Sequence, residues 1–334
     1  MGNAKWLQIF WIIAMGFIMS ELVIVLDHLS KSFGNVHAVQ DLSLHIEAGT
    51  IFGFLGPNGA GKTTTMRMLC GLTHPTAGHA TIERADVWKD RHFVRTKFGY
   101  VPQRFSLYRD LTVLENFRFF GGAYGVPSAE LEPRIERLLK VIDLQEKRNT
   151  EAQSLSGGMR QLLAIGCALV HNPSLLFFDE PTVGLDPVHR QQIWNLLYDL
   201  SNEGKTIFVT THYMDEAERC TEVGFIEDGR LLAKASPRAL KSSFRTRLLE
   251  IDVDPLMPAL VRLRDLPELL GVSLRSGSLR LYAADPERLM AKWRERWPFN
   301  DLRLLGERWV EPDMEDVFTA YSQGYDDVLK RSTP

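Results

Sequence analysis

The sequence has little cysteine, with three residues, Cys70, Cys167 and Cys220, in a chain of 334. They lie far apart and form no C-x-x-C pair, which argues against a zinc site or a disulfide framework and is consistent with a reducing cytosol. Charge of one sign is also lacking, because 39 Lys and Arg are matched by 42 Asp and Glu. Since the two signs are interspersed, there is no basic field to attract nucleic acid, and we expect no nucleic-acid partner.

Long apolar runs are scarce as well. One covers residues 6–19, which is shorter than the ~20 residues that a helix needs to cross a bilayer. Continuation through residues 22–25 would lengthen it. We interpret residues 1–18 as an apolar extension upstream of a natural start at Met19, and a membrane-surface anchor is the alternative.

A glycine-rich loop lies between an apolar run and a helix-like stretch. It reads Gly56-Pro57-Asn58-Gly59-Ala60-Gly61-Lys62-Thr63-Thr64 and contains the pattern G-x-x-x-x-G-K-[ST]. Glycine lets the backbone turn its N–H groups toward an anion, and the helix that follows adds its positive N-terminus. This context predicts a phosphate-binding P-loop, in which Lys62 contacts the β- and γ-phosphates and Thr63 holds Mg²⁺. The alternative is a glycine-rich turn with an incidental lysine.

Three apolar runs without alternation end in polar residues. One precedes Gly56, residues 175–178 precede Asp179 and Glu180, and another run precedes His212. Such runs are typical of a parallel sheet that is covered on both faces, and these sheets bind ligands beyond the carboxyl ends of their strands. We therefore expect the three segments to converge on one nucleotide.

Two further patterns describe the surroundings of this sheet. Short alternating runs between residues 22 and 46, with turns at Gly34 and Gly49, predict an antiparallel β-layer. Helical periodicity between residues 111 and 144 predicts two helices, separated by Gly121-Gly122 and by Gly125-Val126-Pro127. The second pattern indicates a helical insertion within an α/β domain.

Residues 154–161 read SLSGGMRQ. With the P-loop, a glutamine after a strand (Gln103), the Asp-Glu pair, GLDP at residues 184–187 and His212, this motif order resembles the nucleotide-binding domain of the ABC transporter ATPases. The resemblance covers roughly residues 21–235 and is specific, because LSGGxxQ is peculiar to that superfamily among P-loop proteins. It implies an α/β P-loop NTPase with an ABC-type, RecA-like core, an antiparallel β-subdomain and a helical insertion.

The resemblance also assigns roles to the polar residues. Asp179 would hold Mg²⁺ through its water shell, and Glu180 would act as the general base on the attacking water. His212 would contact the γ-phosphate, and Gln103 would sense Mg²⁺ or water. The alternatives are a structural acid, a structural histidine and a surface glutamine. The catalytic candidates are thus Lys62, Glu180 and His212, the metal-site candidates are Thr63, Gln103 and Asp179, and the expected cofactors are ATP and Mg²⁺.

The same resemblance assigns binding roles to two other features. Phe33 aligns with the aromatic residue that stacks on adenine, and the alternative is a core phenylalanine between strands. Ser156, Gly157 and Gly158 open a helix and so form a second anion-binding N-terminus. The family's arrangement is a head-to-tail dimer, in which these residues cap the ATP on the partner's P-loop and Asp186 reaches across the interface.

The last ninety residues change in character. Their β-α-β-β-α-β order predicts a small ferredoxin-like α+β domain. The ending Glu311-Pro312-Asp313-Met314-Glu315-Asp316-Val317-Phe318 resembles the accessory C-terminal domain of ABC-2-type exporter ATPases. We therefore expect an extension at residues 1–18, an ATP-binding domain at 19–245 with its helical subdomain at about 104–168, and an accessory domain at 246–334.

These expectations define a function. The chain would be the ATP-hydrolysing subunit of an ABC-2-type, drug-resistance-like exporter, a homodimer or heterodimer bound to separate integral membrane permease subunits. It would lie at the cytoplasmic face of the inner or plasma membrane. The alternatives are a soluble ABC-type ATPase that acts on a non-membrane partner such as the ribosome, and a nucleotide sensor, which the intact Glu180 disfavours.

Overall fold

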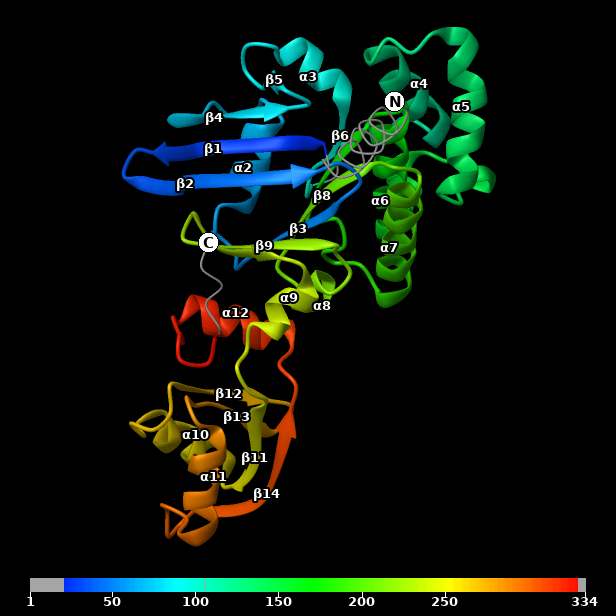
Figure 1. Ribbon diagram of the computed structural model, residues 1–334. Helices are drawn as coiled ribbons and strands as arrows, with labels where there is room; N and C mark the ends of the chain where they lie inside the picture. Colours follow the sequence, from blue (N-terminus) through cyan, green and yellow to red (C-terminus); the bar gives the residue numbers. More distant parts are fainter. Residues whose placement is uncertain (1–20, 105, 330–334) are drawn as a thin grey trace, which may run out of the picture. The chain divides into compact units, whose positions relative to one another are not determined.

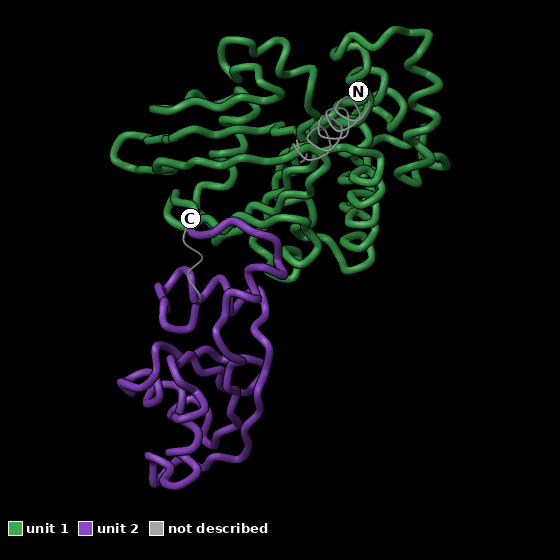
Figure 2. Tube along the Cα trace, in the orientation of Figure 1, with its two compact units in different colours: residues 1–231 green, residues 232–334 purple. Residues whose placement is uncertain are grey.

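The computed structural model describes residues 21–104 and 106–329. The expected extension at residues 1–18 lies outside this range. The described chain forms two compact units, one up to Leu231 and one from Leu232 onward, which Figure 2 colours separately. The division falls within strand β10 (Arg230–Ala235).

An antiparallel sheet forms the first layer of the first unit. Its strands β1 (Leu22–Phe33), β2 (Val36–Glu47), β4 (Ala77–Ile82) and β5 (Ala85–Asp86) are ordered β2-β1-β4-β5 (Figure 1). Alternation in β2 buries Leu42, Leu44 and Ile46. The short runs expected before residue 47 are in fact two long strands that turn at Gly34, where φ is +57°.

A six-stranded sheet positions the site. Its order is β10-β9-β3-β8-β7-β6, with β3 at Ile51–Leu55, β6 at Phe98–Val101, β7 at Leu175–Asp179, β8 at Thr206–Thr211 and β9 at Glu222–Glu227. The strands from β9 to β6 in this order run parallel. Every residue of β3, β7 and β8 is buried, which explains why these runs do not alternate.

The helices of this unit are α2 (Lys62–Leu69), α3 (Arg91–Lys97), α4 (Val113–Ala123), α5 (Ser128–Val141), α6 (Gly157–Leu169), α7 (Pro187–Asn202) and α8 (Met214–Ala217), with 3₁₀ turns at Gln145–Lys147 and Ala152–Ser154. The sequence did not predict the short helices α3 and α8. Gly121 and Gly122 lie inside α4 rather than separating two helices. A Cβ on Gly121 would overlap the side chain of Leu131 in α5, so this glycine allows close helix packing. Among the described residues, no helix is long and apolar enough to cross a membrane.

The second unit begins with the end of β10 and the short helix α9 (Pro237–Ser242). It continues as β11 (Leu248–Asp254), α10 (Leu256–Arg264), β12 (Gly271–Arg275), β13 (Ser278–Tyr282), α11 (Pro286–Glu295), β14 (Arg303–Val310) and α12 (Met314–Ser322). The sheet order is β12-β13-β11-β14, and the neighbours run antiparallel. This is the β-α-β-β-α-β arrangement expected from the sequence. Its apolar core includes Leu249, Ile251, Leu281 and Trp293.

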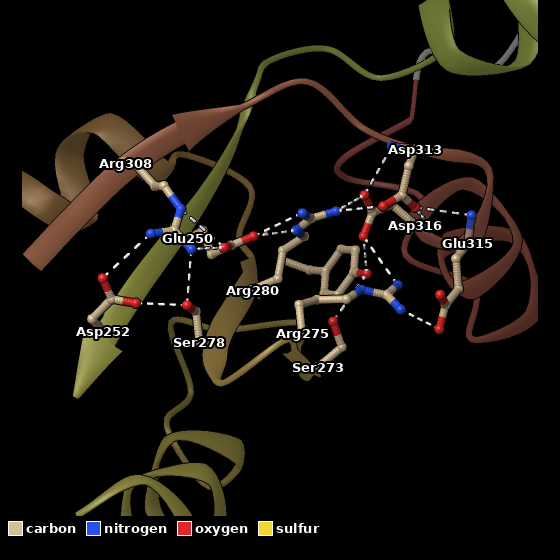
Figure 3. Close-up of polar contacts among 11 residues, drawn as sticks. Glu250, Asp252, Ser273, Arg275, Ser278, Arg280, Arg308, Asp313, Glu315 and Asp316 are labelled. Atoms are coloured by element: carbon tan, nitrogen blue, oxygen red, sulfur yellow. Dashed lines mark hydrogen bonds and ion pairs between the residues drawn. The ribbon is translucent and has the colours of Figure 1, made fainter. Parts of the chain in front are cut away.

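The alternate side chains of this sheet form an ionic network (Figure 3). Arg280 of β13 pairs with Glu250 of β11 at 2.7 Å and with Asp316 of α12 at 2.5 Å. Asp316 is fully buried and also accepts a hydrogen bond from the Tyr282 hydroxyl at 2.8 Å. Arg308 of β14 pairs with Glu250 from the other side. The network therefore attaches α12 to the sheet.

Candidate functional site

The P-loop joins β3 to α2 and requires glycine at two positions. Gly59 and Gly61 have φ values of +85° and +106°, which other residues rarely adopt. A Cβ on Gly61 would also overlap the carbonyl oxygen of Ala38. The helix begins directly after Gly61, so its first N–H groups lie in the loop.

Lys62 is buried at the start of α2. Its Nζ donates hydrogen bonds to the carbonyl oxygens of Gly56 at 2.8 Å and Pro57 at 3.0 Å, and lies 3.4 Å from Glu180 Oε1. A buried ammonium group requires such acceptors, because its transfer out of water is costly. The lysine is therefore held between the P-loop and the carboxylate that follows β7.

Asp179 is the last residue of β7 and is 1% exposed. Its Oδ1 accepts hydrogen bonds from the Thr210 hydroxyl at 2.7 Å and the Thr63 hydroxyl at 3.1 Å. Burial raises the pKa of Asp179, the two hydroxyl groups oppose the rise, Glu180 adds to it and Lys62 opposes it. The structure thus keeps a carboxylate in a place that disfavours its charge, unless a cation is near.

Glu180 follows with a backbone φ of +50°, in the left-handed region. Its N–H is held by the Thr210 carbonyl oxygen at 3.1 Å and hydroxyl oxygen at 3.0 Å. Its Oε2 accepts a hydrogen bond from Gln103 Nε2 at 2.9 Å, and His212 Nδ1 lies 3.3 Å away. The carboxylate of Glu180 therefore contacts Gln103 after β6, His212 after β8 and Lys62 at the start of α2.

Lys62, Glu180 and the groups around them line one cavity of about 560 Å³, and Asp179 lies outside its lining. Its lining comprises Ala38, Asn58, Gly59, Gly61, Lys62, Thr63, Thr64, Gln103, Glu180, Val183 and His212. The ends of β3, β6, β7 and β8 contribute to it or immediately precede the segments that do. The structure therefore brings together residues that span more than half of the sequence, as the three apolar runs predicted.

Phe33 is not part of that lining. It ends β1, is 52% exposed, and has the Lys31 ammonium 4.8 Å from its ring centre. The alternative of a core phenylalanine is wrong, because half of this side chain lies in solvent. An exposed aromatic ring can stack on a planar ligand.

The residues Ser156, Gly157 and Gly158 also lie outside the lining. Ser156 caps α6, since its hydroxyl accepts the Met159 N–H at 3.2 Å. Asp186 caps α7 through its Oδ1, which accepts the N–H groups of Val188 and His189. Within one chain, Ser156, Gly157 and Asp186 are exposed, whereas Gly158 is buried.

Sequence reasoning missed a buried carboxylate next to the site. Glu216 in α8 is fully buried and accepts hydrogen bonds from the hydroxyl groups of Thr182 at 2.6 Å and Thr211 at 2.7 Å. Arg190 of α7 forms an ion pair with it at 3.0 Å. This contact set fixes the segment that carries His212. The sequence signal for this carboxylate is the pair Thr210-Thr211 that ends the buried strand β8.

The donor set fits Mg²⁺. Thr63 and Asp179 supply a hydroxyl and a carboxylate oxygen within 3.1 Å of each other, and hard cations prefer oxygen ligands. No group of three or more His, Cys, Asp or Glu residues suited to a metal is found in residues 21–104 and 106–329. The remaining ligands would therefore have to come from phosphate and water, which is how Mg²⁺ is usually held with nucleotides.

The chain is similar in sequence to a known protein family. The sequence profile of the ABC transporter family matches residues 39–183. The Nod factor export ATP-binding protein I of Ralstonia nicotianae is 38% identical over 301 residues, which make up 90% of this chain and 93% of that protein. This chain belongs to the ATP-binding proteins of ABC transporters. These proteins are ATPases, and the expected α/β P-loop fold with an antiparallel β-subdomain is confirmed.

Other members of the family match about two thirds of the chain. The probable multidrug ABC transporter ATP-binding protein YbhF of Escherichia coli is 41% identical over 222 residues, or 66% of this chain, and the chain spans only 38% of the length of YbhF. The solved ATP-binding cassette MJ0796, a dimer in a post-hydrolysis state with ADP and Pi, is 29% identical with a TM-score of 0.59. The match covers 64% of this chain and 98% of that one.

Proposed function

We propose that this chain is the ATP-hydrolysing subunit of an ABC-2-type export system. The observation that supports this most directly is the cavity at which Lys62, Gln103, Glu180 and His212 meet beside a glycine-rich loop. The Nod factor export protein matches nearly the whole chain, including the second unit. The likeness therefore extends beyond the ATPase core to the accessory domain.

The proposed chemistry uses the residues around the cavity together with Phe33, which lies outside its lining. Lys62 and the P-loop N–H groups bind the phosphates, and Phe33 stacks on the adenine. Glu180 accepts the proton of the attacking water, while Gln103 and His212 orient its carboxylate and the water. The chemistry that Mg²⁺ supplies beside Thr63 and Asp179, when bound, is neutralisation of phosphate charge.

The second half of the site comes from another protomer. One nucleotide cannot easily lie on the helix starts of both α2 and α6 of one chain. In the proposed homodimer or heterodimer, Ser156, Gly157 and Gly158 cap the γ-phosphate on the partner's P-loop, and Asp186 reaches across the interface. ATP then joins the protomers, and hydrolysis lets them separate.

This cycle would drive separate integral membrane subunits at the cytoplasmic face of the membrane. The movement would pass through the helical insertion beside Gln103. Purification of the tagged chain from its native host is expected to recover an integral membrane protein. Recovery of ribosomes instead would favour the alternative of a non-membrane partner.

The central test is Glu180→Gln. Glutamine keeps an oxygen that accepts the Gln103 hydrogen bond but cannot take a proton from water. We expect ATP binding to persist, turnover to fall by at least about a hundredfold, and an ATP-bound dimer to accumulate on size-exclusion chromatography.

The matched control is Lys62→Ala, which removes the buried ammonium and should abolish nucleotide binding itself. If Glu180→Gln binds ATP and Mg²⁺ yet remains monomeric, the two-protomer site is refuted. If it retains normal turnover, the role of Glu180 is refuted.

A further inference from the structure

The start of α7 contacts the start of α6 through a histidine. The ring of His189 lies directly on Gly158, because a Cβ on that glycine would overlap ring atoms Cδ2 and Cγ and lie 2.6 Å from Nε2. Leu185 makes a looser contact, 3.9 Å from a Cβ built on Gly157. Gly158 is buried by this packing, whereas Ser156 and Gly157 remain exposed.

The same ring is held by Asp186. His189 Nδ1 lies 2.5 Å from Asp186 Oδ2, while Asp186 Oδ1 accepts the N–H groups of Val188 and His189. Capping the helix uses only one carboxylate oxygen. The second oxygen is committed to the imidazole, so the side chain of Asp186 is fixed by both of its oxygens.

We propose that His189 is a positioning residue that holds Asp186 and the Ser156–Gly158 tip together as one surface. The proposal rests on the proposed function, in which both features of one protomer meet the nucleotide site of the other. Two groups that must reach the same partner bind more tightly when their separation is fixed beforehand, because less freedom is lost on association. His189 fixes this separation, because its ring contacts Gly158 and its Nδ1 is hydrogen-bonded to Asp186.

Ordinary helix packing would leave a different pattern. An apolar side chain would fill the space between α6 and α7 without a hydrogen-bonding atom, and Gly158 could be replaced by alanine with a small repacking. Here the contact needs both a polar ring and a residue without Cβ. The role therefore predicts a defect in protomer association and not in nucleotide binding by the chain's own P-loop.

The test compares Glu180→Gln with the double variant Glu180→Gln/His189→Ala. We expect the ATP concentration for half-maximal dimer formation to rise roughly tenfold in the double variant. The affinity of each variant for a fluorescent ATP analogue, measured with dilute monomer, should be unchanged. Glu180→Gln/His45→Ala is the control, because His45 is an exposed histidine on β2, and it should dimerise like Glu180→Gln.

Two further variants separate the two contacts. His189→Phe keeps a ring on Gly158 but loses the bond to Asp186, and His189→Asn keeps a donor for Asp186 but loses the ring. Both are expected to dimerise less readily than Glu180→Gln alone when placed in that background. Gly158→Ala should lower the Tm of the nucleotide-free protein, and it should lower it much less when His189 is alanine.

The outcomes distinguish the two claims. If Glu180→Gln itself does not dimerise with ATP, the proposed function fails, and the role of His189 fails with it. If Glu180→Gln dimerises and the His189→Ala double variant does so at the same ATP concentration, only the role of His189 is refuted. An equal loss of affinity at the variant's own P-loop would also refute it, since that result indicates general damage to the fold.

Discussion

At the scale of single residues, the site contains a buried carboxylate whose charge destabilises the fold. Asp179 is almost fully buried, and burial is the main cause of its raised pKa. A carboxyl group whose folded-state pKa is raised destabilises the fold above that pKa, and the cost disappears below the unfolded-state value. The same residue is the candidate Mg²⁺ partner. Stability and function therefore make opposite demands at this position.

This conflict predicts the effect of Asp179→Asn. The amide removes the buried charge but keeps an oxygen that accepts the Thr210 hydrogen bond. We expect the nucleotide-free variant to be more stable at pH 7, by roughly the 0.5–2 kcal/mol that single stabilising substitutions give, while Mg²⁺-dependent ATP hydrolysis is lost. Thermal unfolding at several pH values checks this, because the gain should shrink as the pH falls. A lower Tm at pH 7 would show that the charge stabilises the fold.

At the scale of elements, the segment after β8 is fixed by partners from distant parts of the chain. The Glu216 carboxylate accepts hydrogen bonds from Thr182, in the turn after β7, and from Thr211, at the end of β8. It also forms an ion pair with Arg190 of α7. The Arg190 guanidinium also lies 4.6 Å from the ring centre of Tyr213. His212 lies between Thr211 and Tyr213, so the position of its ring depends on this buried carboxylate.

Glu216→Ala should therefore damage both stability and turnover. Removal of one partner leaves Arg190 without its buried carboxylate, and such losses cost about 3–5 kcal/mol. Displacement of His212 should lower kcat by roughly tenfold to a hundredfold. Denaturant unfolding and ATPase assays measure the two effects.

Asp215→Ala is the control, because Asp215 pairs with the same Arg190 at 3.1 Å but is 66% exposed. A surface pair of this kind contributes less than about 1 kcal/mol. If the two variants behave alike, Glu216 has no special role in placing His212.

The elements themselves were largely predictable, because each has a local signal. Burial on both faces gives β7 and β8 their unalternated runs, and the P-loop has an explicit pattern. Gly121 was misread as a helix break, since its reason is the side chain of Leu131 in another helix. Glu216 and His189 were missed for a related reason. Their roles depend on contacts between helices, and neither residue belongs to a motif.

At the scale of the whole molecule, the two units differ in the side chains that cover their sheets. The sheet of the first unit is covered by apolar side chains, whereas one face of the second unit's sheet carries the network of Figure 3. Burial raises the pKa of Glu250, but the Arg280 and Arg308 guanidinium groups outweigh it, and the net pKa is lowered. Glu250 therefore stabilises the second unit above its ordinary pKa of 4.5, and this contribution is lost as the pH falls through the folded value.

Arg280→Met tests whether this network supports the second unit alone. Methionine keeps much of the side-chain volume but leaves Glu250 and Asp316 with fewer partners, at an expected cost of about 3–5 kcal/mol at pH 7. Calorimetry should show a lower-temperature transition for the second unit, while the transition that ATP raises stays in place. The difference in stability between the variant and the parent protein should shrink below pH 4.5 as Glu250 protonates.

The control is Arg262→Met, which breaks an exposed pair with Asp301 in the same unit and should leave both transitions unchanged. A single transition that shifts as a whole would show that the two units unfold together.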